Sequence, residues 1–506
     1  MSAVTACPRC HRPFDEIGPD GARCAACGTQ YTRETLASAN GHSAAPLPAA
    51  SPPPRRYPRT DTGNAELFVS LYGDQLRYDH RRGRWLVWAG HWWQPDDNSA
   101  VTRLAIKAAR HRYHAAVDID DKHERGREAQ FAIACENRPR IEAMLAIARA
   151  LHPVTDNGDD WDSDPWTFAV VNGVIDLHTG ELRDGRPEDR LSKHAPTAYG
   201  RDATSPVFDR FLGQIIPDRD VRDYIQRLAG YILTGHTHEQ MMGFWHGGGA
   251  NGKSTLADAL MHVMGPDYAR TAAPGLLLKT RNDRHPTELA DLFGARLVVS
   301  VEVDEGRTLA EALMKWLTGG DRVKARFMHQ DFFEFDATAK ILLLANHKPV
   351  VRGRDLAIWR RIKLVPFDVT IAEADQDESL PAKLRDEASG ILNWMLAGCL
   401  AWQMSRLNEP AVMRAATAEY QRDSDELAPF IEECCHLHPE GRCRAAALYA
   451  AYKHWAAAAL SPDETLTAQD FGRRMATDSR FRRSHSKIGW TYQGLSLHAE
   501  PNLNPE

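Results

Sequence analysis

The chain lacks a long apolar run, a signal peptide and an overall positive charge. No stretch of its 506 residues approaches the roughly 18 apolar residues of a transmembrane helix, so we expect no membrane partner. Its first residues, MSAVTACPRC, show no signal peptide. The net charge is −6, so any surface that binds nucleic acid must be local. Nine cysteines without a secretory signal favour metal ligands or free thiols over disulfides, and predict a cytoplasmic protein.

A glycine-rich stretch lies near the middle of the chain, where residues 241–256 read MMGFWHGGGANGKSTL. It contains the Gly-x-x-x-x-Gly-Lys-Ser pattern of a phosphate-binding loop, after an apolar run that predicts a strand and before an amphipathic run that predicts a helix. We expect Lys253 to reach the β- and γ-phosphates of ATP and Ser254 to hold Mg²⁺. The nucleotide-binding candidates are Gly247, Gly248, Gly249, Ala250, Asn251, Gly252, Lys253, Ser254 and Thr255.

Two Cys-x-x-Cys pairs lie in residues 1–33. Cys7 and Cys10 are followed by Cys24 and Cys27, which is the spacing of a zinc ribbon. Four thiolates complete a tetrahedral site, so Zn²⁺ would be structural and would supply the folding energy of this short segment. Residues 34–60 are rich in Ala, Ser and Pro and predict a flexible linker.

Residues 61–205 predict a mixed α+β domain. We expect a Trp-rich hairpin over 84–94, helices over 99–115 and 126–151, and two tight turns within 168–182. The tryptophans favour core packing over a platform for stacking bases.

A pair of acids within this region offers an alternative chemistry. Asp118 and Asp120 on a strand would share Mg²⁺, as in a primase, but the charged residues around them favour a solvated acidic turn. His111 and His114 are interpreted as surface residues.

Two buried strands after the glycine-rich loop are predicted to end in polar residues. The first, over 295–306, carries Glu302, which would bind Mg²⁺ through water or polarise the attacking water; Asp304 and Glu305 are alternatives. The second, over 339–349, ends in Asn346, whose side chain would orient that water.

A basic hairpin and an arginine pair are candidates for contacts beyond the nucleotide. Arg322, Lys324 and Arg326 alternate with apolar residues, share one strand face and precede a tip near His329, which favours contacts with DNA phosphates over an ordinary solvated hairpin. Arg360 and Arg361 are either an arginine finger for the neighbouring subunit's nucleotide or a surface pair.

The tail predicts a winged helix, with helices over 444–460 and 467–478 and a hairpin over 481–497. Its basic face, which suits DNA or alternatively a protein partner, comprises Arg473, Arg474, Arg482, Arg483 and Lys487.

The series GGGANGKST, LVVSVEVDEG, LTGGDRVKARFMHQDFFEF, ILLLANHKP and IWRRIKLVPF resembles the superfamily 3 helicases, above all their phage, plasmid and poxvirus helicase–primase branch. The resemblance implies an AAA+-like P-loop ATPase core, a hexameric ring and translocation on single-stranded DNA. By resemblance, Lys253 and Ser254 are the Walker A pair, Glu302 is the Walker B acid, Asn346 is sensor 1, and the hairpin at 324–331 is the channel loop. Arg360 or Arg361 would be the finger.

The expected fold is therefore multidomain α/β. The expected domains are a zinc ribbon (1–33), a linker (34–60), the family's α+β domain (61–205), a helical oligomerisation segment (206–240), the ATPase core (241–370), a helical lid (371–440) and the winged helix (441–506).

The expected function is ATP-dependent unwinding of forked DNA during replication of a phage or plasmid-type element in a bacterial host cell. Many relatives carry a primase–polymerase domain ahead of this arrangement, where this chain shows only the zinc ribbon and linker, so a separate primase or polymerase is an expected partner. The alternatives are a bifunctional primase–helicase that uses Asp118 and Asp120, and a DNA-binding ATPase switch or defence protein that does not unwind DNA.

Overall fold

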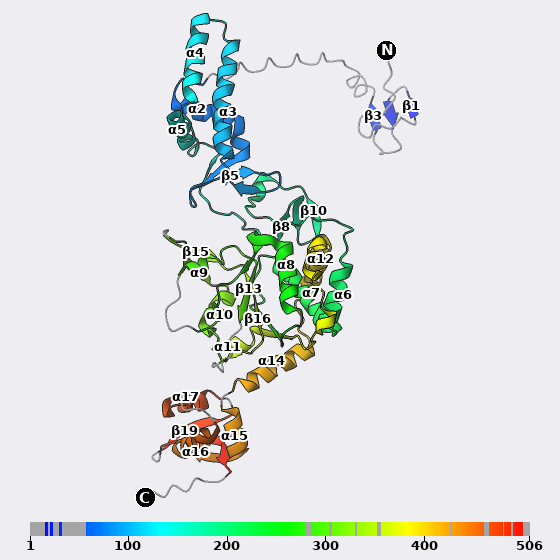
Figure 1. Cartoon of the computed structure of the whole chain (residues 1–506), viewed down its shortest axis with the longest axis vertical. Helices are drawn as coiled ribbons and strands as arrows, with labels where there is room; N and C mark the ends of the chain where they lie inside the picture. Colours follow the sequence, from blue (N-terminus) through cyan, green and yellow to red (C-terminus); the bar gives the residue numbers. More distant parts are fainter. Residues whose placement is uncertain are drawn as a thin grey trace. The chain divides into compact units, whose positions relative to one another are not determined.

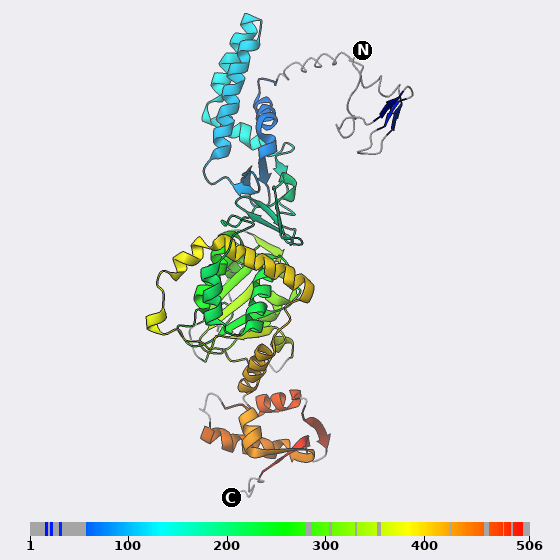
Figure 2. The ribbon, with the colours of Figure 1, turned by 90° about the vertical axis from the view of Figure 1, so that its right-hand side faces the viewer.

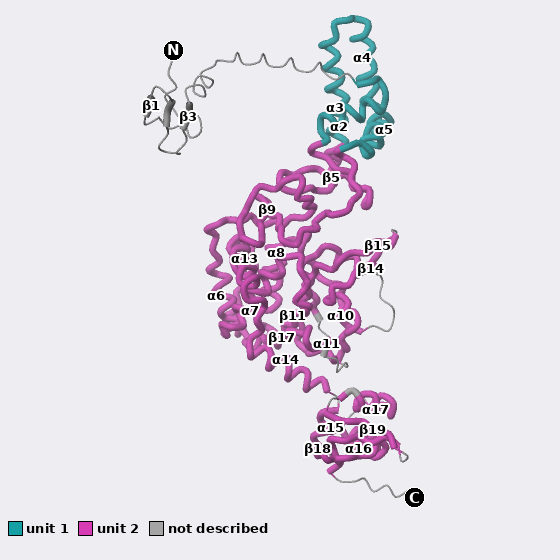
Figure 3. The backbone as a smooth tube through the Cα atoms, turned by 180° about the vertical axis from the view of Figure 1, so that it is seen from behind, with its two compact units in different colours: residues 1–73, 102–152 teal, residues 74–101, 153–506 magenta. Residues whose placement is uncertain are grey.

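The structure is a computed structural model. It describes residues 57–279, 286–302, 306–328, 331–351, 356–425, 427–459, 465–478, 480–486 and 489–498, and the backbone of three strands before residue 33. These strands, β1 (Glu16–Gly18), β2 (Gly21–Arg23) and β3 (Gln30–Thr32), form an antiparallel sheet. All four zinc-ligand candidates lie outside the described residues. The chain divides into two compact units, residues 1–73 with 102–152 and residues 74–101 with 153–506 (Figure 3).

The part of the first unit whose side chains are described is mostly α-helical. The unit contains α2 (Asp61–Tyr72), most of α3 (Ala100–Ala115), α4 (Lys122–Cys135) and α5 (Arg138–Ala148). The helix expected over 99–115 is confirmed, but the one expected over 126–151 is two helices. The break falls before Pro139, which a helix accommodates in its first turn but not in its interior.

The acidic pair lies on a turn rather than a strand. Asp118 ends a 3₁₀ turn, Asp120 follows in the loop, and both are exposed. Asp121 then caps α4 by accepting a hydrogen bond of 2.7 Å from the backbone N–H of Glu124. The solvated-turn interpretation is confirmed, and His111 and His114 are exposed on α3 as expected.

Two small sheets open the second unit. One has the order β6-β5-β4-β7 and comprises β4 (Leu76–Asp79), β5 (Arg84–Trp88), β6 (Trp93–Pro95) and β7 (Thr155–Asp156). The other comprises β8 (Thr167–Val170), β9 (Gly173–Asp176) and β10 (Glu181–Arg183). The expected Trp-rich hairpin is confirmed, with Trp88 paired to Trp93. Trp93 is fully buried against Leu86 and Trp161, and the half-buried Trp88 packs on them, so core packing is confirmed for these two tryptophans of the hairpin.

A five-stranded parallel sheet forms the centre of the second unit. Its order is β12 (Ala269–Thr271), β13 (Leu297–Glu302), β16 (Lys340–Ala345), β11 (Met242–His246) and β17 (Ile362–Pro366). Figures 1 and 2 show helices packed against it. Because both faces are covered, the strands are continuous apolar runs, and every residue of β16 is buried. All parallel strands end at the same edge, where the glycine-rich loop begins.

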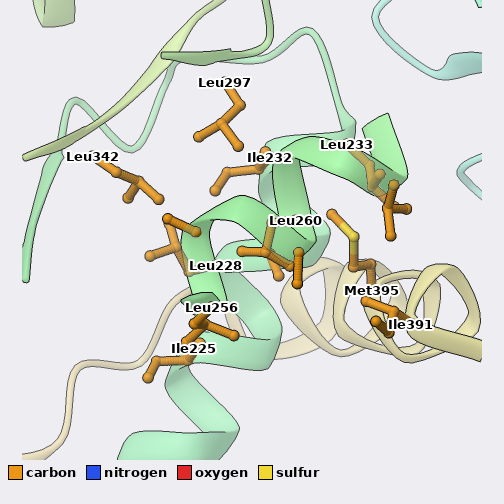
Figure 4. Packing of buried hydrophobic residues seen from close by; sticks show 14 of the residues in the cluster. Ile225, Leu228, Ile232, Leu233, Leu256, Leu260, Leu297, Leu342, Ile391 and Met395 are labelled. Atoms are coloured by element: carbon orange, nitrogen blue, oxygen red, sulfur yellow. The ribbon is translucent and has the colours of Figure 1, made fainter. Parts of the chain in front are cut away.

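One hydrophobic core joins segments that are far apart in the sequence. Figure 4 shows Ile225, Leu228 and Ile232 converging with Leu260 and Met395. They belong to α7 (Arg219–Leu233), α8 (Lys253–Tyr268) and α13 (Ala388–Ser405); α6 (Pro206–Ile215) and α12 (Leu380–Asp386) add to the same layer. The apolar face of the segment expected to mediate oligomerisation is thus buried in the chain's own core.

Two glycines allow α7 and α13 to approach closely. A Cβ on Gly230 would lie 1.9 Å from the backbone nitrogen of Cys399, and one on Gly398 would lie 1.9 Å from the carbonyl oxygen of Gln226. The other face of the sheet packs against a second cluster that includes α9 (Pro286–Ala290), α10 (Glu311–Gly319), α11 (Leu356–Trp359) and α14 (Ala411–Asp423). Beside it, β14 (Arg322–Arg326) and β15 (Phe332–Asp336) form the expected hairpin.

The tail has its own core, built around Phe430, Tyr452, Phe471 and Tyr492. Its elements are α15 (Ala428–Cys434), β18 (Cys435–Arg444), α16 (Ala445–Ala459), α17 (Ala468–Thr477), β19 (Arg482–Ser486) and β20 (Gly489–Leu497). The expected helix, helix and hairpin are confirmed, and Thr467 caps α17. The polar strand β18 was not expected; it pairs with β20 and crosses the expected boundary at residue 441. No helix among the described residues is long and apolar enough to cross a membrane.

Candidate functional site

The glycine-rich loop connects β11 to α8 and needs glycine at two positions. A Cβ on Gly247 would lie 2.2 Å from the carbonyl oxygen of Phe367. Gly252 caps α8 with φ 76°, and a Cβ there would lie 2.6 Å from Ile215. By contrast, a Cβ on Gly248 or Gly249 would meet no described atom within 4 Å. The loop is therefore packed against the protein at its ends and open in its middle, as phosphate access requires.

Ala250 has a backbone conformation that the sequence did not predict. Its φ is 55°, in the left-handed region that alanine rarely adopts. Residues held in such conformations concentrate at binding sites, where surrounding contacts compensate for the strain. Here Asn251 braces the turn, since its Nδ2 donates to the carbonyl oxygens of Gly248 at 2.5 Å and Phe367 at 3.2 Å.

Lys253 begins α8 and folds back over the loop. Its Nζ donates to the carbonyl oxygens of Gly247 at 3.1 Å and Gly248 at 3.4 Å, and to Oδ1 of Asn346 at 2.6 Å. Only 7% of the residue is exposed, and burial lowers the pKa of the Lys253 ammonium. Among the described residues its bonds reach only neutral oxygens. A phosphate would supply the missing opposite charge, so the ammonium fits an anion at this loop.

Strand register brings the predicted polar residues to one edge. Ala345 pairs with Glu302 on one side and with His246 on the other, so β13, β16 and β11 end level with one another. Asn346 follows β16 directly, next to the glycine-rich loop. Glu302 is the last residue of β13; its side chain, Asp304 and Glu305 lie outside the described residues. Which acid acts therefore stays a prediction.

The two arginines of the predicted finger have different environments. Arg360 is exposed, and its Nη2 donates to Oε1 of Gln240 at 3.2 Å. Arg361 is 7% exposed and donates to Oγ1 of Thr318 at 3.1 Å and to the carbonyl oxygen of Ala357 at 2.6 Å. Arg361 is therefore held inside the fold, whereas Arg360 lies at the surface.

The basic hairpin has the expected alternation of its side chains. Arg322 and Lys324 are exposed and Arg326 is half-buried, while Val323 and Ala325 between them are fully buried. The tip candidate His329 lies outside the described residues.

The basic candidates of the tail are surface residues with local partners. Arg473 forms an ion pair of 3.3 Å with Asp470. Arg482 and Arg483 are exposed on β19, and the guanidinium of Arg483 lies 3.8 Å from the ring centre of Trp490. Arg474 is half-buried, and Lys487 lies outside the described residues.

Two buried cations that the sequence did not reveal lie at the opposite edge of the sheet. Arg296 and Lys340 are 4% and 2% exposed, and they donate to the carbonyl oxygens of Leu233 and Thr234 at the end of α7. The negative end of the helix dipole stabilises both charges there. They join α7 to the sheet and lie at the edge away from the glycine-rich loop.

The second unit is thus a parallel α/β assembly with a glycine-rich loop, a buried lysine and a polar strand end at one edge. The family model described as D5 N terminal like matches residues 65–217, and a family of unknown function (DUF5906) matches residues 245–361. These matches and the relatives below confirm the expected resemblance to the helicase–primase family of superfamily 3.

Three viral proteins illustrate the similarity. "Putative helicase L207/L206" of Acanthamoeba polyphaga mimivirus is 30% identical over 293 residues, which cover 53% of this chain and 30% of that protein. "Putative helicase 022R" of Frog virus 3 is 26% identical, covering 60% of this chain and 40% of that protein. "Putative primase C962R" of African swine fever virus is 24% identical, covering 40% and 22%.

The chain spans less than half the length of these relatives. They come from eukaryotic viruses, which does not support the expected bacterial host. Among solved structures, an apo structure of the NrS-1 C terminal region covers 85% of this chain and 98% of that chain with a TM-score of 0.46 at 10% identity, a likeness too weak to carry an argument.

Proposed function

We propose that this chain is an ATP-driven DNA helicase of superfamily 3 that acts in the replication of a viral, phage or plasmid-type element. The observation that carries the proposal is the contact between Lys253 and Asn346 across the mouth of the glycine-rich loop. A phosphate-binding lysine and a water-orienting amide at one strand edge suit the transfer of a phosphoryl group to water.

Each residue at this edge has a defined role in the proposal. Lys253 places a fixed positive charge against the β- and γ-phosphates, where charge develops in the transition state. The amide of Asn346, freed from Lys253, orients the attacking water. The Ser254 hydroxyl and the Glu302 carboxylate are hard oxygen ligands that suit Mg²⁺, which would neutralise phosphate charge when bound.

The proposed working form is a ring, a hexamer by resemblance, with ATP between subunits. Arg360 is the finger candidate because it is exposed, whereas Arg361 is buried and donates to Thr318. Single-stranded DNA would pass the β14–β15 hairpin, and the winged-helix tail would hold the duplex. The four cysteines would bind structural Zn²⁺, and a separate primase or polymerase would act with the ring.

Strand displacement on a forked duplex tests the proposal. The full chain with ATP and Mg²⁺ should separate the strands, Lys253→Ala should not, and the exposed-lysine control Lys279→Ala should match the parent. Hydrolysis of ATP without strand separation would instead favour the ATPase switch, and absence of hydrolysis would reject both.

The primase alternative has weaker structural support. Asp118 and Asp120 lie in an exposed turn, where successive carboxylates are not held on one face. We therefore propose no primer synthesis at this pair. Primer synthesis by the full chain, abolished in an Asp118→Asn, Asp120→Asn variant, would restore the bifunctional assignment.

A further inference from the structure

The return strand of the hairpin cancels part of the charge that β14 presents. In the antiparallel register Arg322 pairs with Asp336, Lys324 with Glu334 and Arg326 with Phe332. Arg322 forms an ion pair of 3.4 Å with Asp336. Only the pair nearest the tip places a cation opposite an aromatic ring. The face is therefore not uniformly basic: Asp336 and Glu334 lie opposite Arg322 and Lys324, and Arg326 lies opposite Phe332, which the exposed Asp331 precedes in the chain.

The tip also exposes apolar surface. Met328 is 68% exposed, Phe332 51% and Phe327 36%. Single exposed apolar residues are common, but three within one hairpin form a patch that soluble proteins usually keep for binding. The Lys324 ammonium lies 5.3 Å and the Arg326 guanidinium 5.0 Å from the ring centre of Phe332. Two cations thus flank an exposed aromatic face.

A chain of ring contacts joins Phe327, one residue of this patch, to the core. Phe327 stacks on Phe333 at 4.9 Å with an interplanar angle of 15°, and Phe333 contacts Phe335 at 5.7 Å and Phe293 at 5.4 Å. Phe335 is 6% exposed and belongs to the core. Phe327 is therefore anchored to rigid structure, whereas Phe332 lies on the opposite, exposed face of β15, opposite Arg326 of β14.

The same rings open onto a large cleft. Phe327, Phe332 and Phe333 line a cavity of about 1790 Å³, larger than the roughly 300–1,000 Å³ of small-molecule sites. Its lining includes acids such as Asp159 and Asp160 as well as bases such as Arg81 and Arg82, so it offers no continuous basic track. The cleft has room for a polymer, and the cations that would hold one lie at the hairpin tip.

We propose that the hairpin grips single-stranded DNA by stacking a base on Phe332, with Lys324 and Arg326 on the flanking phosphates. This inference rests on the proposed function and adds a mode of binding to it. Every base has a π-face, so stacking is independent of sequence, and cations beside an aromatic ring suit an anionic strand. Contact with the bases would let the hairpin hold the strand as well as steer it.

A thermodynamic cycle tests the proposal in the full chain by removing the Phe332 side chain and the DNA bases separately and then together. The probes are an oligothymidylate and an abasic strand of equal length and charge. Parent protein should bind the abasic strand roughly tenfold more weakly, and Phe332→Ala should bind the oligothymidylate roughly tenfold more weakly. Phe332→Ala should then show little further loss on the abasic strand, because ring and base act through one contact.

Matched variants separate stacking from other uses of the patch. Phe332→Trp should bind like the parent, whereas Phe332→Leu, apolar but without a π-face, should behave like Phe332→Ala. If Phe332→Leu keeps full affinity, or if the effects of removing ring and base simply add, the stacking assignment is wrong. A change in the oligomeric state of Phe332→Ala with unchanged affinity would assign the patch to subunit contact instead. Strand displacement by parent protein, measured in parallel, reports on the helicase assignment independently.

Discussion

Lys253 and Asn346, 93 residues apart in the chain, are joined by a hydrogen bond of 2.6 Å between Nζ and Oδ1. The bond links the start of α8 to the end of β16 across the site expected for the terminal phosphates. A bound phosphate would compete with Asn346 for the ammonium. Nucleotide binding would then free the amide to orient water, so that one exchange of partners both binds the substrate and prepares the catalytic group.

This relationship predicts different effects for three variants. Lys253→Ala and Asn346→Ala should each lower kcat roughly 10²-fold, because each removes a group that acts on developing charge. Asn346→Asp should also raise KM for ATP, since a carboxylate at this distance would bind the ammonium strongly and repel phosphate. Steady-state ATPase rates across an ATP series distinguish these results. A KM for Asn346→Asp equal to that of Asn346→Ala would disprove competition for Lys253.

We expect different phenotypes from replacing Arg360 and Arg361, the two arginines that follow α11. Arg360→Ala should lose ATPase activity while keeping the parent's unfolding midpoint, because its side chain is exposed. Arg361→Ala should lower stability by about 1–3 kcal/mol, because it leaves Thr318 and the Ala357 carbonyl without their buried donor. Thermal unfolding together with ATPase assays separates the two. Equal loss of stability in both variants would contradict this division.

A mixing experiment examines whether Arg360 acts across a subunit interface. An Arg360→Ala subunit keeps its glycine-rich loop, and a Lys253→Ala subunit keeps its arginine. Mixed rings would therefore contain some complete sites, and ATPase activity should rise above that of either variant and peak near equal amounts. Subunit exchange is confirmed separately by a labelled chain. Activity that stays at the level of the separate variants would mean that Arg360 does not act in trans.

The hairpin predicts a graded dependence of DNA affinity on salt. Lys324→Ala with Arg326→Ala should weaken single-strand binding across all sequences and reduce the salt slope by about 0.7 for each phosphate that the variant no longer neutralises. Arg322→Ala should change the slope little, because Asp336 already pairs with Arg322. Titrations at several salt concentrations measure both slopes. If Arg322→Ala flattens the slope as much as the double variant, the charge balance across the hairpin does not govern binding.

Local sequence patterns predicted many helices, hairpins and strand faces correctly, because these features depend on contacts between residues that are close in the sequence. The Trp-rich hairpin, the helix over 99–115 and the alternation of Arg322, Lys324 and Arg326 are of this kind. Long-range partners were not predictable. Nothing in the pattern WRRIKL reveals that Thr318 binds Arg361. Likewise, nothing in the pattern RVKAR reveals that Asp336 faces Arg322. The shared core of α7, α8 and α13 was missed for the same reason, since an apolar helix face does not specify what covers it.

The zinc prediction rests on sequence, because its four cysteines lie outside the described residues. One zinc per chain is expected by elemental analysis. Cys24→Ser should release it and unfold residues 1–33, while ATPase activity stays near that of the parent because the metal supports only local folding. Cys399→Ser is the matched control, since Cys399 is buried in the core and free. Purified protein without zinc would refute the ribbon.

The environment of His236 leads us to expect that the second unit becomes less stable to unfolding as the pH falls. Its ring lies among Trp166, Trp402 and His238, and its Nε2 is buried without a hydrogen-bond partner among the described residues. Burial, followed by the nearby charges of His238, Lys340, Arg296 and His178, lowers the pKa of His236 from 6.5 to about 4. Between about pH 6.5 and pH 4, His236 is therefore mostly protonated in the unfolded chain and mostly neutral in the folded protein.

Stability from this group is fully present above pH 6.5 and is lost as pH falls toward 4, because the neutral ring is the form that the folded state favours. Replacing the imidazole with a ring that cannot be protonated should remove the dependence. His236→Phe should show a smaller fall in unfolding temperature than the parent between pH 7 and pH 5, and the exposed control His454→Phe, also in the second unit, should leave the parent's fall unchanged. An equal fall in parent and His236→Phe would mean that other groups govern the acid response.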